Sequence, residues 1–262
     1  YSLLYVIDFS PLSFRTSMKL KMLSEFTADE EKIEADDVEE ALLSNRIYLA
    51  ELVLDSLLIQ CEQQGSTLVE LTTVSVDISE GCSVLKEFDG VMDKEAKGAH
   101  LFREFAFRIN EETDFDVAFD PANPVSTPNT LSSSPKILEK LANAQASLQN
   151  ANIPLDATLG DIQFTEKTLA NGVASGERFP WAGAHSVEGG FNVFNTNLSD
   201  DTSYPIHLYN PVLDIETNQP VSSLMSDQGY LINSGSSWMF VVSFTDEGPE
   251  AKGILTYSQS AD

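Results

Sequence analysis

Basic residues are scarce in this 262-residue chain: 15 Lys and Arg stand against 41 Asp and Glu, a formal net charge of −26. A surface with this charge repels the phosphates of nucleic acids and of anionic membranes. No apolar run approaches the ~20 residues that a membrane-spanning helix needs. The longest, residues 52–59, is interrupted by Asp55 and Ser56. We therefore predict a soluble protein with no nucleic-acid partner and no membrane partner.

Histidine is also rare. His100, His185 and His207 lie far apart, and none has the i, i+4 spacing of a metal-binding helix. His100 shares a predicted helix with Phe102 and Phe105, which favours a structural role. We predict no metal site built from this chain alone.

The two cysteines, Cys61 and Cys82, do not form a zinc knuckle. A bridge between them would close a loop worth about 3 kcal/mol in the chain-entropy model. The sequence pattern leaves two alternatives open, a disulfide or two buried free thiols.

Motifs of self-contained catalysis are absent as well. There is no Gly-x-Ser-x-Gly nucleophile turn, and Ser236 and Ser237 introduce a predicted strand. The acidic groups at 29–31 and 36–40 lack the alternating oxygen ligands and central glycine of a calcium loop, which favours a solvated helix face. Residues 188–190 are typical of a turn, not of a phosphate-binding loop. The residues alone therefore define no active site in this chain.

Apolar residues at three- and four-residue spacing predict helices through the first half of the chain. The expected ranges are 14–26, 37–61 with Asp36 or Asp37 as the cap, 79–91, 96–110 and 135–150. Four prolines interrupt any helix between residues 111 and 135, so this segment is predicted to be a long connection.

Short runs separated by Gly, Asn and Asp predict strands after residue 153, for example 191–194 and 206–209. The clearest runs, 237–244 and 251–257, flank a turn at 246–249 and predict an antiparallel hairpin. The first run is apolar enough to lie inside a covered sheet. The chain is thus predicted to be α+β, with a helical region at 1–150 and a β region at 151–262 forming one structural unit.

Five segments in order resemble the large (beta) subunit of penicillin-acylase-type enzymes, most closely the branch of acyl-homoserine-lactone and aculeacin acylases. They are residues 45–61, 98–105 (GAHLFREF), 153–163 (IPLDATLGDIQ), 188–194 (EGGFNVF) and 235–260. The resemblance covers roughly residues 14–260 and corresponds to the C-terminal part of that subunit. It implies that the strands belong to an αββα sandwich, and that the chain is a piece of a longer precursor.

The resemblance also implies a function. Such N-terminal-nucleophile hydrolases mature by self-cleavage, which exposes a serine whose own α-amino group acts as the base. An asparagine side chain and backbone N–H groups complete the oxyanion hole, and the acyl group of an amide substrate sits in an apolar pocket. The serine and the asparagine lie upstream of the matched region, and this chain begins at Tyr1. We therefore expect this chain alone to be inactive.

The expected partners are the remainder of the large subunit, the small (alpha) subunit and an acyl amide substrate. No cofactor is expected in this chain, because a family calcium site, if present, would lie upstream. A periplasmic or secreted location follows from the resemblance. The acyl preference and the substrate-binding residues cannot be read from the chain. The competing function is a non-enzymatic exported α+β module for binding or interaction.

The resemblance implies a role for Arg15 and a pairing of the two cysteines. Arg15, in the segment FRTSM (14–18), matches the arginine that helps to hold the oxyanion asparagine and the serine amine. The alternative for Arg15 is an ordinary helix residue paired with a surface carboxylate. Cys61 and Cys82 fall where this branch often carries a cysteine pair, which in an exported enzyme implies a disulfide.

Overall fold

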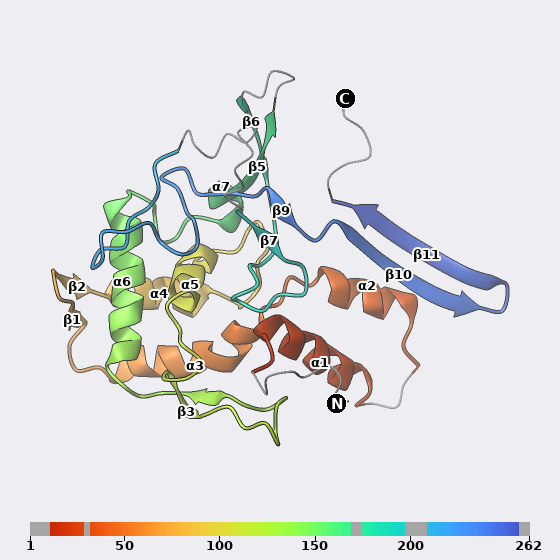
Figure 1. Cartoon of the computed structure of the whole chain (residues 1–262), viewed down its shortest axis with the longest axis horizontal. Coiled ribbons are helices and arrows are strands. Elements are labelled where there is room, and N and C mark those ends of the chain that lie inside the picture. The colour runs from red at the N-terminus through yellow and green to blue at the C-terminus, as the bar shows by residue number, and fades with distance from the viewer. Residues whose placement is uncertain (1–10, 29–31, 169–173, 197–208, 257–262) are drawn as a thin grey trace.

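The computed structural model describes residues 11–28, 32–168, 174–196 and 209–256 (Figure 1). Its helices are α1 (Phe14–Phe26), α2 (Ala35–Leu43), α3 (Tyr48–Gln63), α4 (Ser79–Glu87), α5 (Ala99–Ala106), α6 (Lys136–Asn150) and α7 (Leu159–Ile162). None of these described helices is long and apolar enough to cross a membrane.

The strands form small sheets. Antiparallel pairs join β1 (Leu68–Glu70) to β2 (Ser75–Asp77), β3 (Phe115–Val117) to β4 (Asn129–Leu131), β7 (Phe194–Asn195) to β9 (Ser234–Gly235), and β10 (Trp238–Thr245) to β11 (Gly248–Leu255). A three-stranded sheet has the order β6 (Ala174–Pro180), β5 (Gln163–Thr168), β8 (Tyr230–Leu231), in which β8 runs parallel to β5. The predicted α+β class is confirmed, although one pairing is parallel and four short strands lie in the region expected to be helical.

The single helix predicted over 37–61 is wrong, because α2 and α3 are separate helices. Asn45 adopts a positive φ of 50°, and its carbonyl accepts a hydrogen bond from Met92 N at 2.9 Å. Ile47 N donates to Gly90 O at 3.3 Å. Long-range backbone pairing therefore replaces about one turn of helix, at residues 44–47. The predicted cap is also wrong: Glu34 is the N-cap of α2, and Asp37 accepts a hydrogen bond from Glu34 N at 2.8 Å in a capping box.

The other helices differ from prediction mainly at their ends. The range 14–26 is confirmed, and α6 begins at Lys136 with Pro135 as its N-cap. Helix α4 ends at Glu87, ahead of Gly90 with φ 80°, and α5 starts after Gly98 with φ 74°. Glycine tolerates this backbone region at little cost, which suits Gly98 to its place as the N-cap of α5.

A single hydrophobic cluster includes residues from both regions of the chain. Helices α3, α5 and α6 supply much of it, and every residue of α5 is buried. Buried side chains beyond residue 150, such as Leu159, Tyr230 and Ile232, belong to the same cluster. A disulfide between Cys61 and Cys82, with Sγ atoms 2.09 Å apart, links α3 to α4 at the edge of this core.

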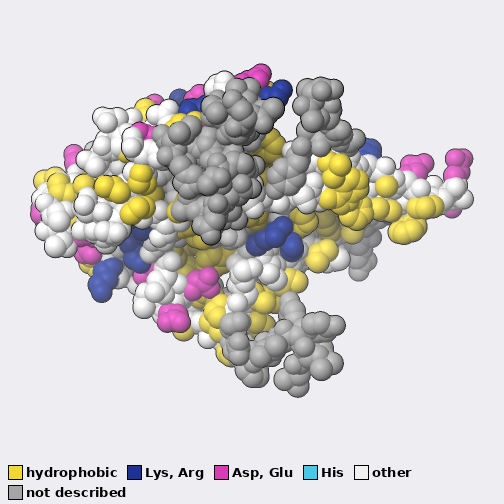
Figure 2. All heavy atoms as spheres, turned by 45° about the horizontal axis from the view of Figure 1, so that its top comes forward, with side chains coloured by type: hydrophobic (Ala, Val, Ile, Leu, Met, Phe, Trp, Pro, Cys, Tyr) yellow, Lys and Arg dark blue, Asp and Glu magenta, His cyan; other side chains and the backbone are white. Residues whose placement is uncertain are grey.

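The predicted C-terminal hairpin is confirmed as β10–β11, which extends away from the rest of the described chain beside α2 (Figure 1). The prediction that its first strand lies inside a covered sheet is wrong for the described residues. Trp238, Phe240 and Phe244 are 53%, 53% and 87% exposed. Figure 2 shows hydrophobic side chains over this projecting hairpin. Only the opposite face, where Val241 is buried, packs toward α2.

Some predictions fall on residues that are not described. Residues 206–208 of the expected strand 206–209, including His207, lie outside the described ranges. The same holds for the acidic residues 29–31 and for the end of the last resembling segment, 257–260.

Candidate functional site

Arg15 lies in the first turn of α1, which begins after the Ser13 cap. Its Nε donates a hydrogen bond to Phe191 O at 3.1 Å, across 176 residues of sequence. The side chain is half-buried. Within the described ranges no carboxylate lies at ion-pair distance from Arg15. The alternative, in which Arg15 pairs with a surface carboxylate, is therefore not found among these residues. Its two Nη groups have no hydrogen-bond partner among the described residues.

A second cation accompanies Arg15. The Lys19 ammonium lies one helical turn later, 5.5 Å from the centre of the Phe191 ring. Partial burial, and then the charge of Arg15, lower the pKa of Lys19. Two positive side chains therefore converge on Phe191 in a chain of net charge −26. The Arg15 guanidinium and the Lys19 ammonium can therefore bind oxygen acceptors supplied by another part of the protein.

The turn formed by residues 185–191, here called the 185–191 turn, connects α1 to the rest of the site. Leu49 N and Tyr48 N, at the start of α3, donate to Glu188 O and Gly189 O at 3.1 and 3.3 Å. Gly189 adopts φ 80° and lies against Phe14. The turn thus contacts the first residues of both helices.

A buried ion pair holds this turn from the inside. Arg103 Nε donates to Glu188 Oε1 at 2.9 Å, and the two side chains are 2% and 0% exposed. His185 N donates to the other carboxylate oxygen at 2.5 Å. Burial raises the pKa of Glu188, although the charge and the hydrogen bond of Arg103 act to lower it. Burial lowers the pKa of Arg103, but the charges of Glu188, Tyr230 and Glu104 and the hydrogen bond to Glu188 together outweigh burial, so the pKa rises. The two N–H groups directed at the carboxylate favour its ionised form.

The remaining donors of Arg103 join further segments. Nη1 donates to Gln163 Oε1 at 2.5 Å, and Nη2 to Gly183 O at 3.2 Å. The guanidinium carbon lies 4.6 Å from the centre of the Tyr230 ring, and Tyr230 Oη donates to Glu104 Oε1 at 2.7 Å. Burial and the Glu104 carboxylate raise the pKa of Tyr230 well above its usual value, which keeps it a donor.

Three of the resembling segments therefore meet at Arg103: residues 98–105, 153–163 and 188–194. Sequence reasoning missed Arg103. The available signal was a charged residue on a strongly apolar helix, between Phe102 and Phe105.

The histidines that the structure describes have structural contacts. His100 is fully buried and its Nε2 lies 2.8 Å from Pro154 O, so Nε2 carries the proton. Burial lowers the pKa of His100 to about 4. The His185 ring packs 4.7 Å from the Phe107 ring. No group of three His, Cys, Asp or Glu able to hold a metal ion is found in the described ranges.

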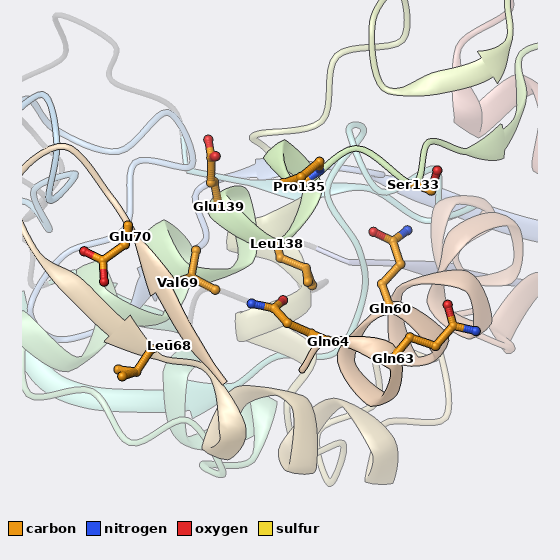
Figure 3. Close-up of a pocket in the computed structure, with 10 residues that line it drawn as sticks. All are labelled: Gln60, Gln63, Gln64, Leu68, Val69, Glu70, Ser133, Pro135, Leu138 and Glu139. Carbon is orange, nitrogen blue, oxygen red and sulfur yellow. The ribbon is translucent and has the colours of Figure 1, made fainter. Parts of the chain in front are cut away.

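An open pocket of about 490 Å³ lies between the end of α3, β1 and the start of α6 (Figure 3). Gln60, Gln63 and Gln64 line one side, and the carboxylates of Glu70 and Glu139 line another. Gln60 Nε2 donates to Ser132 O at 3.0 Å. The lining contains no nucleophile with an adjacent base, and none of the Arg15 contacts reaches it. It is not a candidate catalytic site.

The chain belongs to the penicillin amidase family, since a sequence model of that family matches residues 2–262. It is 26% identical over 259 residues to aculeacin-A acylase of Actinoplanes utahensis, an alignment that covers 97% of this chain and 28% of that protein. It is also 26% identical over 260 residues to the acyl-homoserine lactone acylase PvdQ of Pseudomonas putida, again covering 97% of this chain and 28% of the relative. The chain thus spans less than a third of the length of these curated relatives.

Proposed function

We propose that this chain is the C-terminal portion of the large subunit of an amide-hydrolysing acylase, whose N-terminal serine nucleophile lies in the remainder of the protein. The family match across nearly the whole chain carries this proposal. The names of the relatives, aculeacin-A acylase and acyl-homoserine lactone acylase, support an acyl amide as the substrate class. Membership in this family also disfavours the competing function of a non-enzymatic module.

In this reaction Arg15 is a supporting residue. Its Nε is occupied by Phe191 O, which leaves the planar pair of Nη groups for the side-chain oxygen of the oxyanion asparagine. A fixed positive charge also lowers the pKa of a nearby amine, so Arg15 would keep the serine α-amino group in its neutral, basic form. The proton then passes from the serine hydroxyl to that amine, and the asparagine stabilises the oxyanion.

Kinetics of a full-length Arg15→Lys enzyme test this role. Lysine keeps the charge but loses the planar fork, so kcat should fall on the order of 10²–10³-fold, the effect of losing one oxyanion donor. The matched control is Arg46→Lys, since Arg46 makes surface ion pairs with Glu25 and Glu51. The control should retain wild-type kinetics. Wild-type kinetics for Arg15→Lys would place this arginine on the ordinary helix surface.

We further propose that one face of the β10–β11 hairpin docks on the remainder of the precursor. Cross-strand pairing places Trp238, Phe240, Val242 and Phe244 on the same face as Leu255, Gly253, Ala251 and Pro249. All eight are apolar or glycine. The opposite face is occupied by α2, where Lys252 pairs with Asp36 and Glu39 at 3.2 and 2.8 Å. A second sheet packing on the open face would form two stacked sheets, as the family resemblance implies.

Assembly of the mature protein tests this docking. Phe244→Asp in the full-length protein should lower the yield of assembled large and small subunits, because it places a charge in the buried interface. Val117→Asp, at an apolar side chain of β3 that is 41% exposed, is the control and should assemble normally. Equal assembly of the two variants would contradict the docking proposal.

We propose a periplasmic or secreted location for the protein, which the disulfide between Cys61 and Cys82 supports because such bonds persist in oxidising compartments. Immunodetection in separated cytoplasmic, periplasmic and medium fractions of the source cells tests it. Recovery in the cytoplasm alone would contradict the proposal.

A further inference from the structure

We propose that the 185–191 turn is a positioning element that sets the orientation of Arg15, with Gly189 and Glu188 as its positioning residues. The inference rests on the proposed role of Arg15 in acyl amide hydrolysis. The new element is that the 185–191 turn determines where the Arg15 guanidinium points.

The inner side of the turn is anchored to the core. Glu188 is fully buried, and its carboxylate accepts hydrogen bonds from Arg103 Nε and His185 N. Arg103 also donates to Gly183 O, just before the turn. An ion pair without exposure to water has few alternative arrangements, because moving either charge leaves the other unpaired. The turn is therefore held in one place relative to α5.

The outer side of the turn contacts Arg15 and the residue before it, Phe14. Phe191 O accepts the hydrogen bond from Arg15 Nε, which orients the guanidinium. At Gly189 an added Cβ would lie 2.5 Å from Phe14 Cβ and 2.7 Å from the Phe14 carbonyl carbon. The turn thus sets the backbone that precedes Arg15 as well as its side chain. The first turn of a helix lacks complete hydrogen bonding, so α1 alone would hold Arg15 loosely.

Two glycine substitutions separate positioning from backbone strain. Gly189 and Gly176 have nearly equal φ values, +80° and +78°, so alanine introduces similar strain at both. At Gly176 nothing lies within 4 Å of the added Cβ, whereas at Gly189 the added Cβ displaces Phe14. In the complete, processed enzyme, Gly189→Ala should lower kcat by about 10- to 100-fold with little change in KM, since small misplacements of a catalytic group have effects of this size. Gly176→Ala should retain wild-type kcat.

A double-variant comparison tests whether the effect passes through Arg15. If it does, Gly189→Ala should have little further effect in an Arg15→Lys background, because the positioned group is already lost. Glu188→Asp is a second variant that keeps the buried charge but shortens its reach. It should likewise lower kcat by about tenfold or more, and only when Arg15 is present.

The outcomes distinguish this inference from the proposed function. Wild-type kinetics for Arg15→Lys would overturn the role of Arg15 itself. Impaired Arg15→Lys together with wild-type Gly189→Ala and Glu188→Asp would overturn the positioning inference alone. Additive losses in the double variants would also overturn it. Failure of both turn variants to fold, with Gly176→Ala folded, would show a folding element instead of a positioning one.

Discussion

The ion pair of Arg103 and Glu188 is buried on both sides, so the loss of one partner should lower stability strongly. Glu188→Gln would leave the Arg103 charge buried without its partner, so we expect a loss of about 3–5 kcal/mol in unfolding free energy. Glu62→Gln is the control, since Glu62 pairs with Lys86 in a solvent-exposed ion pair and should change stability by no more than about 0.5 kcal/mol. Urea denaturation of the chain measures both. Similar stability of the two variants would contradict the buried, ionised pair.

His100 should make stability depend on pH. Its pKa of about 4 in the folded chain lies below the ordinary histidine value near 6.5, so the unfolded chain binds the proton more readily. Stability contributed by neutral His100 is therefore present above pH ~6.5 and is lost as the pH falls toward 4. The loss should amount to at most about 3 kcal/mol. Denaturation of wild type and His100→Gln between pH 4 and 7 should show a flatter pH dependence for the variant. Identical slopes would rule out this contribution.

Among the elements, α3 and α4 are joined by the disulfide of Cys61 and Cys82. Labelling with a thiol reagent under denaturing, non-reducing conditions should detect no free thiol in protein from an oxidising compartment. Reduction should lower the unfolding free energy by about 3 kcal/mol, the loop-closure value for this spacing. Two labelled cysteines per chain would contradict the bond, and would weaken the proposed periplasmic or secreted location.

Elements were predictable where local sequence determines them. Helix α1 has the predicted bounds because Ser13 caps its first turn and apolar residues follow at helical spacing. The hairpin β10–β11 was predictable because a polar turn separates two apolar runs. The break after α2 was not, because it depends on hydrogen bonds that join Asn45 to Met92 and Ile47 to Gly90, residues far away in the sequence. The strands β1 to β4 were also missed, because each has only 3 residues and so carries little pattern.

At the scale of the whole molecule, we expect this chain in isolation to hydrolyse no acyl amide. The proposed serine nucleophile lies in the remainder of the protein. The measurement is turnover of an acyl-homoserine lactone or a phenylacetyl amide by the chain purified free of other subunits. Catalysis by this preparation would contradict the proposed division of the active site.

The sequence by itself determined the α+β class, most helix positions and the family, because helical spacing, caps and ordered motifs are local properties of the chain. It also pointed to Arg15 through its motif. Only the tertiary structure decided what Arg15 touches, since its carbonyl partner lies 176 residues away. The same is true of Arg103 and Glu188, which are 85 residues apart. The physical reason is that a buried charge needs a partner, and the partner of Arg103 comes from a distant segment that no local pattern specifies.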